Sequence, residues 1–369
     1  MTQAEKPIQP NQTPQTSADT STKTSTKQAN AEQVNAVPRV SVVMPVYNYA
    51  EFLPRAVNSL LEQSFSDWEL IISDNASTDN TEEVARAFAD QDVRIHYFRN
   101  DSNVGVCGNF NLCEARANPD SQYIFGLPAD DWLQPDALEQ LVAAADANPD
   151  VTITYCDGYR MDGETNLGRY SDMFKQVAPA GKHCELGMLY RYNYIPFQGA
   201  LVNRPLARPV YPQPPQQGLH DPELTYTSDY HMWLQLLSRG ARAYYVDEPL
   251  VYILKHERAN TMPANIIARL HQEVRVFEKL EGTCPAELDA IRVRSLTDRL
   301  ARLSFLYLQK GERTQANTHL KRAMRISPTR RLDVTVATAL SWLPLPGKSL
   351  AYVWRLVTAA HVRLKRGQA

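Results

Sequence analysis

The sequence lacks any long apolar run, and this absence argues against a membrane span. The longest candidate, residues 334–345, is interrupted by Pro344 and falls short of the roughly 18 apolar residues that a span needs. The amino-terminal stretch MTQAEKPIQPNQ develops no apolar segment either. We therefore expect no cleaved export signal and a cytoplasmic location.

Motifs of several common enzyme classes are also missing. There is no GxxxxGKS/T phosphate loop, no GxSxG turn and no HExxH helix, which disfavours P-loop hydrolases, serine hydrolases and zincins. The five cysteines show no CxxC spacing, so we expect reduced thiols with structural roles. A formal net charge of -2 gives no indication of nucleic acid as a partner.

What the sequence does contain is a core-forming composition, in which 43% of the residues are apolar. Residues 1–38 are rich in Thr, Gln, Ser and Asn and nearly free of large apolar side chains, so we expect a disordered tail there. From Arg39 onwards, short apolar runs alternate with amphipathic stretches. This alternation predicts an α/β fold with a mostly parallel sheet that is covered by helices on both faces.

The expected elements of this α/β domain lie within residues 39–260. Strands are expected at 40–45, 68–73, 95–99, 123–127, 152–156, 195–202, 242–246 and 250–254. Helices are expected at 50–62, 81–90, 106–117, 135–147 and 228–238. In such folds ligands bind at the carboxyl ends of the parallel strands, so we expect the functional side chains in the loops that follow them.

Beyond residue 261 helical patterns follow one another, which predicts an all-α carboxy-terminal appendage. Within 261–330, the stretch 300–328 resembles one tetratricopeptide-type hairpin, and a single unit favours a packing role over a peptide-binding groove. Within 331–369, apolar and basic residues interleave at 352–366. Two interpretations of that segment remain open, a helix on an anionic membrane surface and an ordinary docked terminal helix.

Two adjacent acids, Asp130 and Asp131, follow directly on an apolar strand in the segment YIFGLPADDWLQP. Hard ions such as Mg²⁺ or Mn²⁺ prefer carboxylate oxygen, and they keep few protein ligands when substrate phosphates complete their shell. The pair therefore suits a metal site. The alternative is that one of the acids caps the helix that opens near Pro135.

Polar or aromatic side chains follow three other predicted strands. Tyr47 follows the first strand, where its ring either stacks on a base or lies as a buried edge aromatic. Asp74 ends the second strand and can accept hydrogen bonds from a nucleobase or a ribose, whereas Asp79 accounts for capping of the next helix. Asn103 belongs to a third loop with turn-forming residues and amide donors.

The ordered set VSVVMPVYN, ELIISDNASTDNT, NVGVCGNFN and YIFGLPADDWLQPDAL resembles the family 2 glycosyltransferases, which are inverting enzymes with a GT-A nucleotide-sugar-binding fold. The resemblance covers about residues 39–260 and implies a Rossmann-like sheet. It implies a metal ligand at Asp130 and a neighbouring contact to ribose, sugar or metal-bound water at Asp131. It further implies donor binding by the following residues: Pro45, Tyr47, Asp74 and Asn103.

The later motifs TSDYHMWLQLLSRG and VYILKHERANT extend the resemblance. The first implies that Asp229 is the general base that takes the proton of the acceptor hydroxyl, although an acid favoured by the helix dipole is the alternative. The second places His256 near the diphosphate or the metal. Many family members carry an acid where this chain has Pro128, and that departure puts one sugar or ribose contact in doubt.

The sequence thus predicts a metal-dependent transferase that uses Mg²⁺ or Mn²⁺. We expect it to move a sugar from a nucleoside diphosphate sugar to a saccharide or lipid-linked acceptor, in bacterial surface polysaccharide biosynthesis. Peripheral contact with the inner membrane face is part of this expectation. The alternatives are a nucleotidyltransferase that acts on a sugar phosphate and a non-catalytic protein that binds nucleotide or glycan.

Overall fold

The computed structural model describes residues 37–174, 181, 186–210, 219–257 and 263–327. The tail expected at 1–38 lies outside these ranges except for its last two residues, and the segment 331–369 lies wholly outside them. The unit that begins at Pro38 contains every element named below. Among the helices of the described part, none combines the length and the hydropathy of a membrane span.

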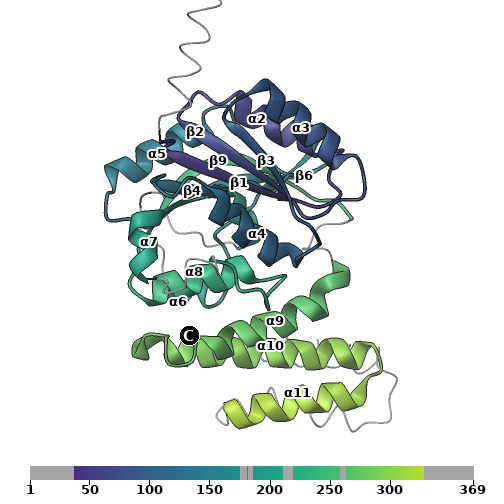
Figure 1. Cartoon of the computed structure of the whole chain (residues 1–369). Coiled ribbons are helices and arrows are strands. Elements are labelled where there is room, and N and C mark those ends of the chain that lie inside the picture. The colour runs from purple at the N-terminus through teal and green to yellow at the C-terminus, as the bar shows by residue number, and fades with distance from the viewer. Residues whose placement is uncertain (1–36, 175–180, 182–185, 211–218, 258–262, 328–369) are drawn as a thin grey trace, which may run out of the picture. The chain divides into compact units, whose positions relative to one another are not determined.

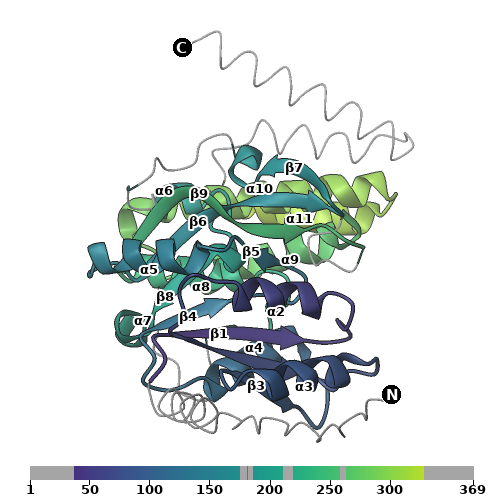
Figure 2. The same ribbon diagram turned by 90° about the horizontal axis from the view of Figure 1, so that it is seen from above.

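The centre of the fold is a mixed sheet with nine strands in the described ranges. Its order is β3-β2-β1-β4-β8-β6-β9-β5, with β7 added to β6 (Figure 2). The strands are β1 (Val40–Val46), β2 (Trp68–Asp74), β3 (Ile95–Arg99), β4 (Tyr123–Gly126), β5 (Trp132–Leu133), β6 (Ile153–Asp162), β7 (Thr165–Arg169), β8 (Ala200–Asn203) and β9 (Ala243–Leu254). The first four in this order are parallel, β8 is antiparallel to both of its neighbours, and β9 is parallel to β6.

Helices cover both faces of this sheet (Figure 1). The α-helices are α2 (Leu53–Leu61), α3 (Thr81–Gln91), α4 (Gly105–Arg116), α5 (Ala137–Ala147), α6 (Leu186–Leu189), α7 (Arg204–Val210), α8 (Ser228–Ser238), α9 (Ile266–Lys279), α10 (Asp289–Gln309) and α11 (Arg313–Ile326). Short 3-10 turns lie at Ser171–Met173, Phe197–Gly199, Pro263–Asn265 and Ala286–Leu288.

The apolar strand β1 contributes side chains to both faces of the sheet, because successive side chains of a strand point to opposite sides. Val42 packs into the core that also contains Leu53 of α2 and Leu141 of α5. Its neighbour Val43 packs into a smaller cluster with Cys113 of α4. A strand that is buried on both faces has a continuous apolar run rather than an alternating one, which is what the sequence of β1 shows.

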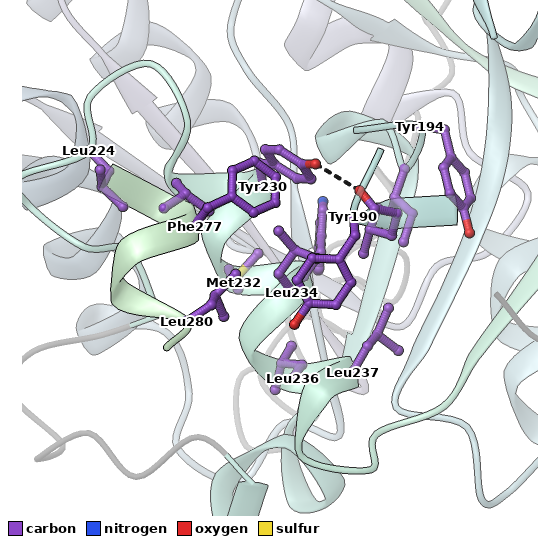
Figure 3. Packing of buried hydrophobic residues seen from close by; sticks show 14 of the residues in the cluster. Tyr190, Tyr194, Leu224, Tyr230, Met232, Leu234, Leu236, Leu237, Phe277 and Leu280 are labelled. Carbon is purple, nitrogen blue, oxygen red and sulfur yellow. Dashed lines mark hydrogen bonds between the residues drawn. The ribbon is translucent and has the colours of Figure 1, made fainter. Parts of the chain in front are cut away.

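A second core lies under β6, β8 and β9, where α8 is buried on all sides (Figure 3). The hydroxyl of Tyr230 donates a hydrogen bond of 2.7 Å to the carbonyl oxygen of Leu189, and the Tyr230 ring meets Phe277 of α9 edge-on at 6.0 Å. A hydrophobic helix without a polar face is typical of an element enclosed by others. α8 is therefore fixed between the sheet and the carboxy-terminal helices.

The carboxy-terminal part of the described chain is helical. α10 and α11 form a helix–turn–helix in which Gly311, with φ of +80°, lies in the short turn. Glycine adopts this left-handed conformation without steric cost. Leu300 and Leu303 of α10 pack with Phe277 of α9 in the second core. The helical region expected at 261–330 therefore packs on the α/β domain.

The structure confirms the α/β fold and differs from the sequence prediction in three details. The strand expected at 195–202 was wrong at its start, because a 3-10 turn precedes β8. The two final strands expected at 242–246 and 250–254 are one strand, β9, whose pairing with β6 shifts register at Asp157 and Gly158. β5 and β7 were not predicted, since one has two residues and the other is largely exposed.

Candidate active site

The carboxyl ends of the first parallel strands meet at one edge of the sheet. Val46 at the end of β1 is in register with Asp74 at the end of β2, and Asp74 is in register with Arg99 at the end of β3. β4 runs beside β1 in the same direction and leads into Asp130. The four loops singled out in the sequence therefore follow neighbouring strands at this edge, as parallel pairing requires.

Asp74 is fully buried at the end of β2. Its Oδ1 accepts a hydrogen bond from the Ser77 amide at 2.8 Å, and its Oδ2 accepts one from the Tyr97 hydroxyl at 2.8 Å and one from Arg99 Nη1 at 2.5 Å. Burial and the Asp74 carboxylate together raise the pKa of Tyr97 well above its usual value. Asp74 thus fixes the loop after β2, and its expected base contact stays a prediction.

Tyr47 is 42% exposed beyond the end of β1, whereas Pro45 lies within the strand. The interpretation of Tyr47 as a buried edge aromatic is therefore wrong. The next residue, Asn48, has φ of +56°, a left-handed conformation that asparagine tolerates better than most residues. Its side-chain Oδ1 accepts a hydrogen bond of 2.7 Å from the Thr78 amide, which ties the loops after β1 and β2 together.

Asn103 closes the loop that leads into α4. Its Oδ1 accepts hydrogen bonds of 2.9 Å from the Asn75 side-chain amide and from the Gly105 amide. Asn75 in turn accepts from the Val104 amide through its own Oδ1 at 2.9 Å. The loops after β2 and β3 are thus joined by amide side chains, as the turn-forming composition of this segment predicts.

Asp130 meets His256 at the same edge. Nε2 of His256 lies 2.7 Å from Oδ2 of Asp130, and the imidazole ring packs at 4.9 Å from the ring of Phe52 and at 6.0 Å from that of Tyr49. Both side chains remain partly accessible, at 16% for Asp130 and 12% for His256. The two metal-ligand candidates are therefore neighbours in space.

Asp131 is 4% exposed and has a different environment from Asp130. Its Oδ1 accepts a hydrogen bond of 2.8 Å from the Leu254 amide of β9, and burial, followed by the charge of Asp130, raises its pKa well above the usual range. α5 begins only at Ala137, and Asp136 is its N-cap residue. The alternative that Asp130 or Asp131 caps this helix is therefore wrong.

The fit of a divalent ion depends on the number of ligands that the chain supplies. Within the described ranges, no group of three or more His, Cys, Asp or Glu side chains is arranged to hold a metal. Asp130 and His256 offer one oxygen and one nitrogen atom side by side. A pair of this kind fits an ion whose remaining positions are filled by substrate phosphates and water.

Asp229 lies in the first turn of α8 and lines a pocket of about 740 Å³. Its Oδ2 accepts a hydrogen bond of 2.9 Å from Asn193 Nδ2, and burial raises its pKa above the usual value. Ile253 of β9 lines the same pocket, and the next residue, Leu254, binds Asp131. Consecutive residues of β9 therefore connect the pocket in front of Asp229 to the acid pair, while neither acid lines the pocket.

Buried polar contacts hold the start of α8 in place. Nδ1 of His220 lies 3.1 Å from the Ser228 hydroxyl, and the imidazole ring stacks on Phe110 at 4.7 Å. Burial lowers the pKa of His220 to about 4, so the ring is neutral at neutral pH. The anchor of Tyr230 on Leu189 adds a second fixed point beside Asp229.

Residues 41–202, which contain the strand-end loops and the acid pair, match the model of glycosyl transferase family 2. Over these residues the chain matches that family. The match ends before Asp229 and His256, so the family model covers the loops that follow β1 to β4 and not these two later residues.

Relatives with curated names agree with this assignment. The chain is 38% identical over 111 residues, or 30% of its length, to the putative glycosyltransferase EpsE of Bacillus subtilis, and it spans 39% of that protein. It is 28% identical over 218 residues, or 58% of its length, to the putative teichuronic acid biosynthesis glycosyltransferase TuaG of the same organism, of which it spans 79%. The chain thus spans well under half of EpsE.

Solved structures share the fold of this chain. The 1–349 fragment of TarS from S. aureus in complex with UDP-GlcNAc has a TM-score of 0.62 at 17% identity, over 87% of this chain and 92% of that one. The mannosyltransferase PcManGT from Pyrobaculum calidifontis, in complex with GDP-Man and Mn²⁺, has a TM-score of 0.55 at 18% identity, over 92% and 93%. At these identities the likeness establishes the GT-A fold.

Sequence reasoning missed several residues that build the site. Tyr97 and Arg99, which hold Asp74, lie on an exposed strand whose alternation gave no such indication. Asn193, which holds Asp229, lies in a segment without any recognisable motif. The wall of the pocket that α9 and α10 supply was also missed, because helical periodicity identifies a buried face but not the surface against which it packs.

Proposed function

We propose that this family 2 chain is an inverting glycosyltransferase. It moves a sugar from a nucleoside diphosphate sugar to a hydroxyl of a saccharide or lipid-linked acceptor, in the assembly of a bacterial surface polysaccharide. The observation that carries the proposal is the position of Asp229, which lines a pocket that β9 connects to the Asp130–Asp131 pair through Ile253 and Leu254. The complexes of TarS and PcManGT with nucleotide sugars favour the same class of donor.

Asp229 acts as the general base in this proposal. An acceptor hydroxyl is a weak nucleophile at neutral pH, and a carboxylate within hydrogen-bonding reach removes its proton as the oxygen attacks the anomeric carbon. Burial raises the pKa of Asp229, which makes the carboxylate a stronger base than an exposed aspartate, while the hydrogen bond from Asn193 orients it. Attack from the face opposite to the leaving nucleotide inverts the anomeric configuration.

Asp130 and His256 are proposed to hold Mg²⁺ or Mn²⁺. Their atoms lie 2.7 Å apart, and the partly accessible carboxylate of Asp130 leaves room for further ligands from outside the chain. When bound, such an ion neutralises the charge that develops on the diphosphate leaving group. The Mn²⁺ in the PcManGT complex favours this assignment.

The remaining loops are proposed to bind the donor nucleoside. Tyr47 offers an exposed ring on which a base can stack. Asp74 and Asn103 hold the neighbouring loops in place by accepting hydrogen bonds from backbone amides. Pro45 shapes the end of β1, and Asp131 contributes near the ribose or the sugar. We place the reaction on the cytoplasmic side of the membrane, where nucleotide sugars are made, with peripheral membrane contact as part of the proposal.

The test is a transfer assay with a panel of nucleotide sugars, in the presence and absence of EDTA. Asp229→Asn should abolish transfer and leave nucleotide binding intact, and Asp130→Ala should remove the metal dependence together with most of the activity. Asp136→Ala is the matched control, since Asp136 is an exposed aspartate that lies shortly after Asp130 in the sequence. Full activity of Asp229→Asn would reject the base, and release of pyrophosphate would instead indicate a nucleotidyltransferase.

A further inference from the structure

The pocket in front of Asp229 is completed by helices that lie outside the segment matched by the family model. The lining residues from α10 are Arg294, Ser295, Asp298, Arg299 and Arg302, and those from α9 are Arg269, Leu270 and Glu273. Five arginines line the pocket: Arg191, Arg269, Arg294, Arg299 and Arg302. Three carboxylates line the same pocket, those of Asp229, Glu273 and Asp298. The lining therefore carries an excess of positive charge.

Two of these arginines serve the structure of the protein. Arg299 Nε lies 2.7 Å from Glu273, its Nη2 donates to the carbonyl oxygen of Arg191, and its guanidinium group lies 4.5 Å above the ring of Phe277. Arg269 lies 3.8 Å from the same Glu273. One glutamate is thus shared by two arginines, and both guanidinium groups are held in place.

The other three arginines have no such role. Within the described part of the chain, the guanidinium groups of Arg191, Arg294 and Arg302 form no ion pair or hydrogen bond with another side chain. All three residues are exposed. Arg294 and Arg302 are eight residues apart on α10, a spacing that places both on one face of a helix. They converge on a pocket that also contains the proposed base.

We propose that Arg191, Arg294 and Arg302 bind an oxyanion of the acceptor, a phosphate or a carboxylate carried by a saccharide. The proposal rests on the proposed function, since it assigns this pocket to the acceptor. Guanidinium groups bind carboxylate and phosphate through two parallel hydrogen bonds, which positions a substrate as well as attracting it. An acceptor held in this way presents its hydroxyl to Asp229, which lines the same pocket.

The rim of the pocket fits the saccharide part of such an acceptor. Tyr192 is 50% exposed and Met173 is 47% exposed, and both line the pocket beside Phe174, whose ring lies 6.2 Å from that of Tyr192. Flat apolar surfaces of this kind pack against the C–H faces of sugar rings, while a few charged groups fix orientation. The rim and the arginines together therefore favour an anionic saccharide over a neutral one.

The first experiment measures binding without catalysis. Glucose 6-phosphate, glucuronate and glucose are titrated into the full chain by calorimetry with EDTA present, so that a metal-dependent donor site is silent. We expect binding of at least one anionic sugar and none of glucose. The double variant Arg294→Gln/Arg302→Gln should weaken that binding at least tenfold, whereas Arg325→Gln, an exposed arginine of α11 outside the pocket, should not.

The outcomes distinguish a phosphate from a carboxylate as the bound group, and they also test the proposal itself. Binding of the phosphate alone, or of the uronate alone, supports the proposal and identifies the group. Equal binding of glucose, or wild-type binding by the double variant with its thermal unfolding unchanged, overturns it. Because this binding experiment needs no turnover, it tests the anion site even if the chain does not transfer sugar.

The second experiment uses transfer activity. In the double variant kcat/KM for an anionic acceptor should fall at least tenfold, while hydrolysis of the donor without acceptor stays unchanged. A neutral acceptor of the same length should be used equally poorly by both proteins. Loss of donor hydrolysis as well would indicate general damage to the site and would contradict a role confined to the acceptor.

Discussion

Nε2 of His256 lies 2.7 Å from Oδ2 of Asp130, although 126 positions of the chain separate the two residues. Strand pairing brings them together, because β5 begins two residues after Asp130 and pairs with β9, with Trp132 opposite Tyr252. His256 follows the end of β9 within two residues. The short strand β5 therefore sets the distance between the two proposed metal ligands.

The pairing predicts that His256 contributes to metal affinity. His256→Asn should lower the apparent affinity for Mn²⁺ by about tenfold or more, since loss of a ligand or of its hydrogen-bonding partner typically has an effect of this size. The measurement is the Mn²⁺ dependence of donor hydrolysis, with binding by calorimetry beside it. His96→Asn, on the exposed strand β3, is the control. An unchanged Mn²⁺ requirement in His256→Asn would remove this residue from the site.

Gly126 at the end of β4 is predicted to tolerate no side chain. A Cβ atom at this position would overlap the ring of Phe197, and that ring is enclosed by Phe110 at 5.0 Å, His220 at 5.5 Å and Trp233 at 6.5 Å. Gly126→Ala should therefore destabilise the fold by about 1–3 kcal/mol, as overpacking of a close-packed core does. Chemical denaturation with two-state analysis measures the change.

A second substitution tests the cause of this effect. In Gly126→Ala/Phe197→Leu the smaller side chain removes the overlap, so the double variant should lose less stability than the sum of the two single variants. Additive losses would show that the Phe197 ring is not what excludes a side chain at Gly126. Transfer activity should follow stability here, because Phe197 also lines the pocket in front of Asp229.

Asp74 is predicted to matter for stability as well as for donor binding. In Asp74→Ala the buried Ser77 amide and the Tyr97 hydroxyl lose their acceptor, and an unpaired buried donor costs on the order of 1–3 kcal/mol. The free energy of unfolding should therefore fall, and the KM for the donor should rise. Tyr97→Phe removes one donor only and should fall between wild type and Asp74→Ala. A large rise in KM without any loss of stability would assign Asp74 to the nucleotide alone.

The strands β1, β2 and β4 could be predicted because their apolar runs report burial on both faces directly. β9 was expected as two strands because Asp247, Glu248 and Pro249 interrupt its pattern, yet the structure accommodates them where β6 shifts its register. Local composition cannot reveal such an accommodation, since it depends on the partner strand. The same holds for β7, an exposed strand whose only neighbour is β6 among the described elements.

The site was predictable to the extent that its residues follow strands. Parallel pairing alone brings the loops of Tyr47, Asp74 and Asp130 to one edge, so their order in the sequence was enough to place them together. The grouping of Asn193 with Asp229, and of α10 with both, depends on how helices pack on the sheet. Amphipathic periodicity does not determine that packing, so the part of the pocket that α9 and α10 line could not be predicted from the sequence.

Asn193 is predicted to tune the proposed base. Burial raises the pKa of Asp229, and the hydrogen bond from Asn193 stabilises the ionised form and opposes that rise. Because a base must be ionised, kcat/KM should fall as the pH drops through this raised pKa. In Asn193→Ala the acid limb should move to higher pH, on the order of one unit for the loss of a hydrogen bond to a charged group. An acid limb that stays at the same pH would show that Asp229 is not the group whose protonation limits activity.

Asp229→Asn is predicted to stabilise the fold while removing transfer. A pKa raised by burial means that the folded state disfavours the ionised carboxylate, and this penalty is complete at every pH above the folded-state pKa. Asparagine removes the charge, and its side-chain oxygen can still accept from Asn193. The midpoint of thermal unfolding should therefore rise at neutral pH, by roughly 2–4 °C for each kcal/mol gained.

The pH dependence of this gain in stability distinguishes a buried general base from an acid that only lies at the surface. As the pH falls below the folded-state pKa, wild-type Asp229 becomes protonated and its penalty disappears, so the advantage of Asp229→Asn should shrink and vanish below the ordinary aspartate range. Asp136→Asn, at an exposed position, should give no gain at any pH. A loss of stability in Asp229→Asn at neutral pH would mean that the carboxylate serves the fold. A gain would mean that its burial is retained for chemistry, since active-site groups are often held at a cost in stability.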